Sequence, residues 1–135
     1  MCISEGRKSK YTPEEMNNKY RFQERWQREN GYITKSYRIN GETLKHLLEV
    51  SKKYKLSQAG ILRDSFTYYK NSNKEVFVKK YKSVLESKKI DIKKGFKINL
   101  MFAAEIESVC NENNFMYGVF VTTILDEFLE YIERG

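Results

Sequence analysis

Two short segments, ITKSYRI at residues 33–39 and IKKGFKI at residues 92–98, share one pattern of alternating apolar and polar side chains. Alternation with a period of two is typical of a β-strand that is buried on one face and exposed on the other. A lone strand of this length is not stable in water. The chain thus encodes the same short strand twice, and each copy needs a partner.

The likeness between the two segments continues through the residues that follow them. A shift of 59 positions places Leu47 on Ile106 and Phe66 on Leu125 without a gap. Apolar residues recur at three and four positions after each strand, as in amphipathic helices, and Ser57 is suited to cap the second of them. Because chance would not preserve one strand pattern and two helix patterns in a single register, we infer an internal duplication.

A strand–helix–helix unit near 40 residues cannot bury a core of its own, so the two units are expected to share one. The predicted fold class is mostly α with one short two-stranded ribbon. Lysines crowd the connector between the units, where they are either solvated or in contact with phosphate. The predicted organisation in chain order is an N-terminal helical arm at 1–31, a first unit at 32–70, a connector helix at 71–90 and a second unit at 91–135, with 32–135 as one joint domain.

Charge is distributed unevenly along the chain, which has 25 basic and 18 acidic residues and a net charge of +7. Residues 99–135 contain seven acids against Arg134 alone, so residues 1–98 carry 24 basic and 11 acidic groups. The basic part favours a polyanion as partner, whereas the acidic part would repel one.

Other functional classes find little support in the sequence. Cys2, Cys110 and His46 cannot assemble a metal site of the usual soft ligands. There is no nucleophile at a meaningful spacing from the histidine and no glycine-rich phosphate loop, so we expect neither an enzyme nor a cofactor or small-molecule substrate. The sequence has no apolar leader or membrane-length segment, and we expect a cytoplasmic protein without a membrane partner.

The segment YRINGETLKHLLEVSKKYKLSQAGIL, at residues 37–62, resembles the ribbon-helix-helix DNA-binding proteins, which include the Arc and MetJ repressors. It matches their strand end, turn, first helix, short corner and second helix. The resemblance covers residues 33–69 well and 92–132 moderately. It implies an antiparallel ribbon over four interlocked helices, here as an intramolecular pseudo-dimer, with one ribbon face in the DNA major groove. A tandem copy is similar to the TraY-type relaxosome proteins of conjugative plasmids.

The polar face of the predicted ribbon offers hydrogen-bonding groups suited to base edges, among them an arginine that can bond two acceptors of a guanine. Each of these positions could also be a plain exposed strand position. The predicted base-reading residues are Thr34, Ser36, Arg38, Lys93, Gly95 and Lys97.

Phosphate contacts are expected from two sources. Lys35 and Lys94 lie on the apolar strand face, from which a long side chain can reach outward, either to phosphate or only to solvent. The resemblance also implies an anion site at the start of the second helix, formed by Ser57, Gln58 and Ala59. The second unit has Met116, Tyr117 and Gly118 there, with no capping side chain, which puts the second phosphate site in doubt.

The resemblance implies sequence-specific binding of double-stranded DNA, most simply by a bacterial or mobile-element transcriptional repressor. A relaxosome accessory protein that binds near a plasmid transfer origin would use the same surface. A further alternative is an antitoxin or a protein-assembly module. The acidic second half suggests possible self-association on DNA.

Overall fold

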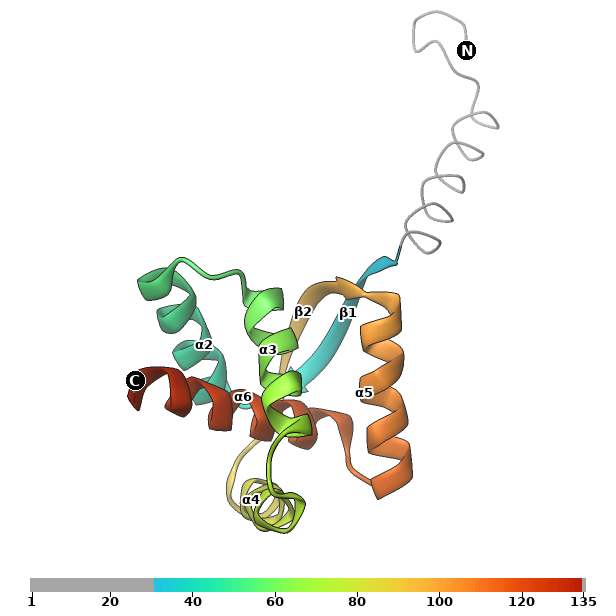
Figure 1. The fold of residues 1–135 in the computed structure, drawn as a ribbon. Helices are drawn as coiled ribbons and strands as arrows, with labels where there is room; N and C mark the ends of the chain where they lie inside the picture. Colours follow the sequence, from blue (N-terminus) through green and yellow to red (C-terminus); the bar gives the residue numbers. More distant parts are fainter. Residues whose placement is uncertain (1–30, 135) are drawn as a thin grey trace, which may run out of the picture.

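The computed structural model describes residues 31–134, so the predicted helical arm lies outside the described residues except for Gly31. Within the described part, five helices accompany one antiparallel two-stranded sheet, which we call the β-ribbon. The predicted mostly helical fold with one short ribbon is therefore confirmed. The elements are β1 (Tyr32–Ile39), α2 (Gly41–Tyr54), α3 (Gln58–Lys70), α4 (Lys74–Ser87), β2 (Ile92–Asn99), α5 (Leu100–Asn113) and α6 (Tyr117–Arg134) (Figure 1).

The register of the β-ribbon is symmetrical about its middle. Ser36 lies opposite Gly95, which is also the residue 59 positions further along the chain. Thr34, two residues before Ser36, lies opposite Lys97, which corresponds to Arg38 under the shift of 59 positions. Arg38, two residues after Ser36, likewise lies opposite Lys93, which corresponds to Thr34. The neighbouring pairs on the same face are Thr34 with Lys97 and Arg38 with Lys93.

The helix ends repeat with the same shift. Asn40 caps α2 and Asn99 caps α5 through their side-chain oxygens, which accept two backbone N–H groups in α2 and one in α5. Lys55 and Asn114 then end these helices in the left-handed conformation, with φ of 56° and 58°. Both pairs are 59 residues apart, so the local structure of the second half follows that of the first.

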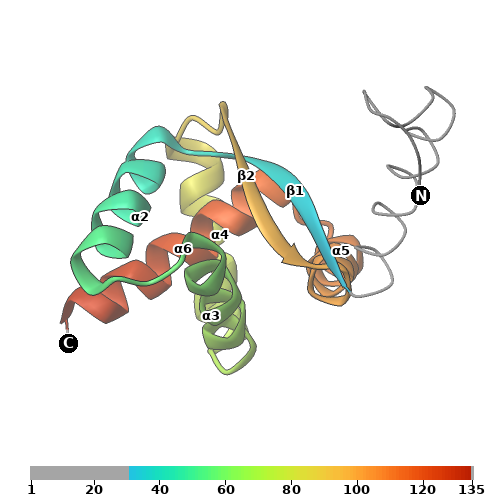
Figure 2. The same ribbon diagram turned by 90° about the horizontal axis from the view of Figure 1, so that it is seen from above.

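Helix α6 runs through the middle of the molecule and packs against β1 and against all the other described helices. Seen from above, it lies beneath the β-ribbon (Figure 2). Its residues 119–125 are all buried, as expected for a helix that is apolar on nearly every side. Phe120 contacts the rings of Phe66, Tyr69 and Phe77, which brings both halves of the chain into one core.

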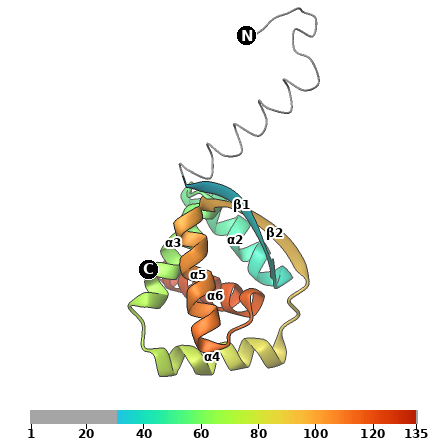
Figure 3. The same ribbon diagram turned by 90° about the vertical axis from the view of Figure 1, so that its right-hand side faces the viewer.

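Helix α4 lies at the end of the molecule opposite the β-ribbon (Figure 3). It buries one apolar face, with Phe77, Tyr81 and Val84, and leaves most of its lysines exposed. Ser72 and Asn73 are both residue types suited to cap this helix. Asn73 caps the helix, because the Ser72 hydroxyl instead donates to the carbonyl of Tyr69 at the end of α3.

None of the helices in the described part of the chain is long and apolar enough to cross a membrane.

Candidate nucleic-acid interface

The outer face of the β-ribbon brings all six predicted base-reading residues together. Each is exposed, and the register joins them into three cross-strand pairs. Arg38, Lys93 and Lys97 give this face three positive charges, and neither strand contains an acidic residue. The face is therefore cationic and rich in hydrogen-bond donors.

Burial of the opposite face fixes which side chains point outward. Tyr37 and Ile39 of β1, with Phe96 and Ile98 of β2, are buried against the helices. A register slip of one residue would bury the lysines and expose these apolar groups, so the alternation holds the polar face in place. At the ends of the ribbon this face is less completely buried, because Ile33 is half-buried and Ile92 is 38% exposed.

Because Gly95 has no side chain, the outer face of the β-ribbon has a depression at its middle. A Cβ atom there would lie 3.4 Å from Thr34 Cγ2 and 3.6 Å from Ser36 Oγ, so even a methyl group would fill the space between these side chains. A ligand can approach the backbone more closely at Gly95 than elsewhere on the face.

The first turn of α3 lies beside one end of the β-ribbon. Ser57 caps the helix as predicted, with its hydroxyl accepting from the Gly60 N–H at 2.9 Å, and half-buried Gln58 and Ala59 follow it. Free N–H groups at a helix start carry positive partial charge and attract anions. A shallow groove joins this turn to the ribbon, lined by Tyr32, Ala59, Arg63, Lys97, Ile98, Asn99 and Phe102.

Two residues that line this groove, Arg63 and Tyr32, were not among the predicted site residues. Exposed Arg63 adds a positive charge near Lys97, and it follows Ala59 by four residues on the same helix face. Tyr32 precedes Thr34 by two residues, so it lies on the same strand face, and it is 51% exposed. Strand β1 begins at Tyr32, one residue earlier than predicted. Helical spacing and the strand alternation, extended by one step, would have identified both.

Lys35 and Lys94 lie on the helix-facing side of the β-ribbon, as the alternation predicts. Both are half-buried, with Lys35 opposite Phe96 and Lys94 opposite Tyr37. The Lys94 ammonium lies 5.3 Å from the centre of the Phe96 ring. These lysines border the apolar core and do not join the three outer pairs.

The start of α6 is covered by the connector between the two units. The N–H of Met116 donates to the Tyr81 hydroxyl of α4 at 2.7 Å. A Cβ at Gly118 would collide with the carbonyl oxygen of Arg38 and with the side chain of Ile90. An anion therefore cannot approach this helix start as it can approach that of α3.

Most acidic residues of the second half pair with basic residues of the first half or the connector. Of the seven acids after residue 99, four form such pairs. His46 holds the pKa of Glu133 below its usual range through a hydrogen bond. The acidic helices thus neutralise basic groups away from the ribbon face. The pairs are Lys70 with Glu105, Lys80 with Glu127, Lys88 with Asp126, and both His46 and Lys53 with Glu133.

Cys110 is fully buried in the core, and burial raises the pKa of its thiol to about 12. A thiol in this state is a packing group and a poor nucleophile. Among residues 31–134, no group of three or more His, Cys, Asp or Glu side chains is placed to hold a metal ion.

The geometry defines a narrow, two-stranded cationic surface with a helix start beside one of its ends. Comparison of the chain with protein-family models, with curated proteins and with solved structures found no match.

Proposed function

We propose that this chain is a tandem ribbon-helix-helix protein, in which the two halves form an intramolecular pseudo-dimer that binds double-stranded DNA. The outer face of the β-ribbon enters the major groove and reads bases. The observation that carries the proposal is the alignment of Thr34, Ser36 and Arg38 against Lys97, Gly95 and Lys93 on one exposed face. The symmetrical register supports the pseudo-dimer, because two equivalent strands related by a two-fold axis would pair in the same way.

The dimensions and chemistry of this face suit the major groove. The groove is about 12 Å wide and admits a two-stranded β-ribbon. Arg38 can donate two hydrogen bonds to the O6 and N7 acceptors of a guanine, while Lys93 and Lys97 donate single bonds. Thr34 and Ser36 can donate or accept, so the first strand discriminates more strongly between bases than the second.

Contacts to the DNA backbone hold the β-ribbon in the groove. Ser57, Gln58 and Ala59 present the start of α3 to a phosphate beside the ribbon, and Arg63 adds a full charge there. Lys35 and Lys94 reach phosphates from the ribbon edges. The covered start of α6 makes no equivalent contact, so the DNA is held more firmly at the α3 end.

The base-reading residues of the two strands differ at every position, which favours a DNA site without two-fold symmetry. The simplest biological role is a transcriptional repressor of bacterial or mobile-element origin. A relaxosome accessory protein would use the same surface, and footprinting on the DNA that flanks the gene separates the two. Protection near a promoter supports repression, and protection near a transfer origin supports the relaxosome role.

The proposal is tested by measuring the affinity of two variants for a selected DNA duplex by fluorescence anisotropy. Arg38→Ala is expected to weaken binding by about 1–3 kcal/mol and to relax the preference at one base pair. Lys79→Ala is the control, because this variant also removes one positive charge. Lys79 is exposed on α4, which lies at the opposite end of the molecule from the β-ribbon. Equal losses in the two variants, or no selectable DNA sequence at all, would contradict major-groove reading by the ribbon.

A further inference from the structure

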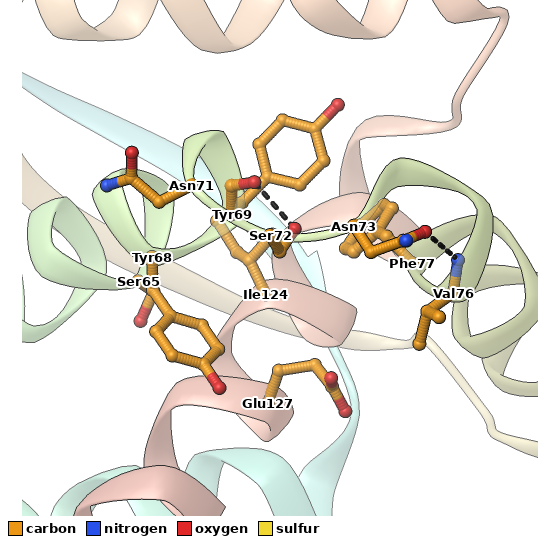
Figure 4. Close-up of a pocket in the computed structure, with 10 residues that line it drawn as sticks. All are labelled: Ser65, Tyr68, Tyr69, Asn71, Ser72, Asn73, Val76, Phe77, Ile124 and Glu127. Atoms are coloured by element: carbon orange, nitrogen blue, oxygen red, sulfur yellow. Dashed lines mark hydrogen bonds between the residues drawn. The ribbon is translucent and has the colours of Figure 1, made fainter.

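A cavity of about 310 Å³ opens where α3, α4 and α6 meet. This volume is at the lower end of the range of about 300–1,000 Å³ that is typical of small-molecule sites. The cavity involves the end of α3, whereas the ribbon lies beside the start of that helix. It is lined by Ser65, Tyr68, Tyr69, Asn71, Ser72, Asn73, Val76, Phe77, Ile124 and Glu127 (Figure 4).

The aromatic walls of the cavity are held in place by packing. Tyr69 and Phe77 are buried, and their rings meet edge to face with 4.6 Å between centres. Tyr68 is packed by Tyr131 and Phe128, with ring centres at 4.9 and 5.8 Å. Because these neighbours fix the rings in advance, a ligand can bind without ordering them first.

One acidic side chain lines the cavity. Among the described residues that line it, Glu127 alone has a charged side chain, and that side chain is only 24% exposed. One carboxylate oxygen lies 3.1 Å from the ammonium of Lys80, which is outside the lining. A half-buried carboxylate beside aromatic rings is a combination that attracts cations.

The end of α3, at the rim of the cavity, already holds the ammonium group of Lys74. The carbonyl groups of Tyr69, Lys70 and Ser72 all accept hydrogen bonds from the Lys74 ammonium, at 2.7, 3.0 and 3.2 Å. This ammonium also lies 4.5 Å from the centre of the Tyr69 ring. The rim of the cavity thus already binds one cation through the negative end of a helix and an aromatic face.

From these contacts we infer that the cavity is a binding site for a small organic cation, namely a compound with an amine group and an apolar body. The amine takes the place of Lys80 beside Glu127, and the apolar body packs against Tyr68, Tyr69 and Phe77. Because the cavity walls come from both halves of the chain, a bound ligand stabilises their association. This inference does not depend on DNA binding.

The site is tested with phenethylamine as probe, by the shift in the thermal unfolding temperature and by calorimetric titration. Phenethyl alcohol and phenylacetate have the same aromatic body with neutral and negative groups. We expect phenethylamine to raise the unfolding temperature of the full chain and to bind at least about tenfold more tightly than either analogue. Equal binding of all three compounds, or no binding of the amine, would overturn the assignment.

Variants separate the cavity from other acidic surface. Glu127→Gln keeps the shape of the side chain but removes its charge, and is expected to weaken phenethylamine binding about tenfold. Glu130→Gln is the matched control on the same helix, because Glu130 is exposed and does not line the cavity. Val76→Trp places bulk at an exposed position of the rim and should block binding while α4 remains folded. Unchanged binding in both cavity variants would locate the probe elsewhere.

Discussion

Two tyrosine residues, buried to the same degree, differ in what their hydroxyl groups contact. Tyr37 lies beneath the β-ribbon, and its hydroxyl has no hydrogen-bond partner among the described residues. Loss of solvent raises its pKa well above the usual range. The hydroxyl of Tyr81, in contrast, accepts the N–H of Met116 at the start of α6. A buried polar group without a partner destabilises a fold, whereas a satisfied one supports it.

Replacing each tyrosine by phenylalanine should therefore have opposite consequences. Tyr37→Phe is expected to leave the free energy of unfolding unchanged or to raise it, since the variant removes a buried hydroxyl that bonds nothing. Tyr81→Phe should lower the free energy of unfolding by about 1–2 kcal/mol, because the Met116 N–H loses its acceptor. Urea unfolding followed by circular dichroism measures both, and an equal loss in the two variants would show that Tyr37 bonds a group not seen in the structure.

For single residues, the sequence predicted the position of a side chain wherever that position follows from a short-range pattern. Alternation alone assigned Thr34, Ser36 and Arg38 to the exposed face, and the structure places them there. The cap of α4 could not be predicted in the same way, because Ser72 and Asn73 are both good capping residues. The choice depends on the Tyr69 carbonyl, which attracts the Ser72 hydroxyl only after α3 has formed.

Strand β1 and helix α6 approach each other closely at Gly118. An alanine there would bring its Cβ into the backbone carbonyl of Arg38, and neither backbone can move freely. At Gly41, also in a first helical turn, a Cβ would meet only Ile92 Cγ1 at an ordinary 3.7 Å.

Gly118→Ala should consequently lower the free energy of unfolding by about 1–3 kcal/mol, the usual cost of overpacking. Gly41→Ala is the control and should be neutral or stabilising by up to about 1 kcal/mol, since alanine reduces the freedom of the unfolded chain. Thermal unfolding of both variants measures the difference, and a Gly118→Ala protein as stable as the control would contradict the close approach.

The two equivalent helix caps also differ in what else they bond. Asn40 caps α2, and in addition its N–H donates to the Thr122 hydroxyl at 3.2 Å and its side-chain amide to the Lys89 carbonyl at 2.9 Å. It thus connects β1, the connector and α6. Asn99 caps α5 through the Met101 N–H at 2.7 Å.

Asn40→Ala is expected to cost about 2–3 kcal/mol, since both the cap and the bond to the connector are lost, whereas Asn99→Ala should cost about 1 kcal/mol. Chemical unfolding of the two variants under one set of conditions measures the ratio. Equal costs would mean that the Lys89 carbonyl finds another donor once Asn40 is gone.

Helix positions along the chain were predictable, but their contacts across the molecule were not. A helix cap such as Ser57 is local and can be recognised directly in the sequence. The covering of the α6 start by Tyr81 of α4 depends on a contact between residues 35 positions apart. Periodicity of apolar residues cannot predict such a contact, because it shows which face of a helix is buried but not which element packs against that face.

For the molecule as a whole, pairing of β1 with β2 inside one chain makes folding a unimolecular event. The midpoint of urea unfolding should therefore be the same at all protein concentrations, unlike that of an obligate dimer. Unfolding curves recorded over a wide concentration range measure this. A midpoint that rises with concentration would indicate exchange of strands between two molecules.

The proposed DNA complex should also respond strongly to salt. Each neutralised phosphate lowers the logarithm of the binding constant by about 0.9 per logarithm of salt concentration. Arg63→Ala is expected to reduce the magnitude of the measured slope by about one, because Arg63 is assigned to a phosphate beside α3. A complex whose affinity does not change with salt would rule out the electrostatic part of the proposal.

Joining both strands in a single polypeptide has a consequence for how the protein can evolve. In a homodimer, every substitution in the strand appears twice and alters both halves of whatever the strands contact. Here Ser36 and Gly95 occupy equivalent positions but are encoded separately. Mutation can change one while leaving the other untouched, so the two halves of the proposed DNA site can diverge one step at a time.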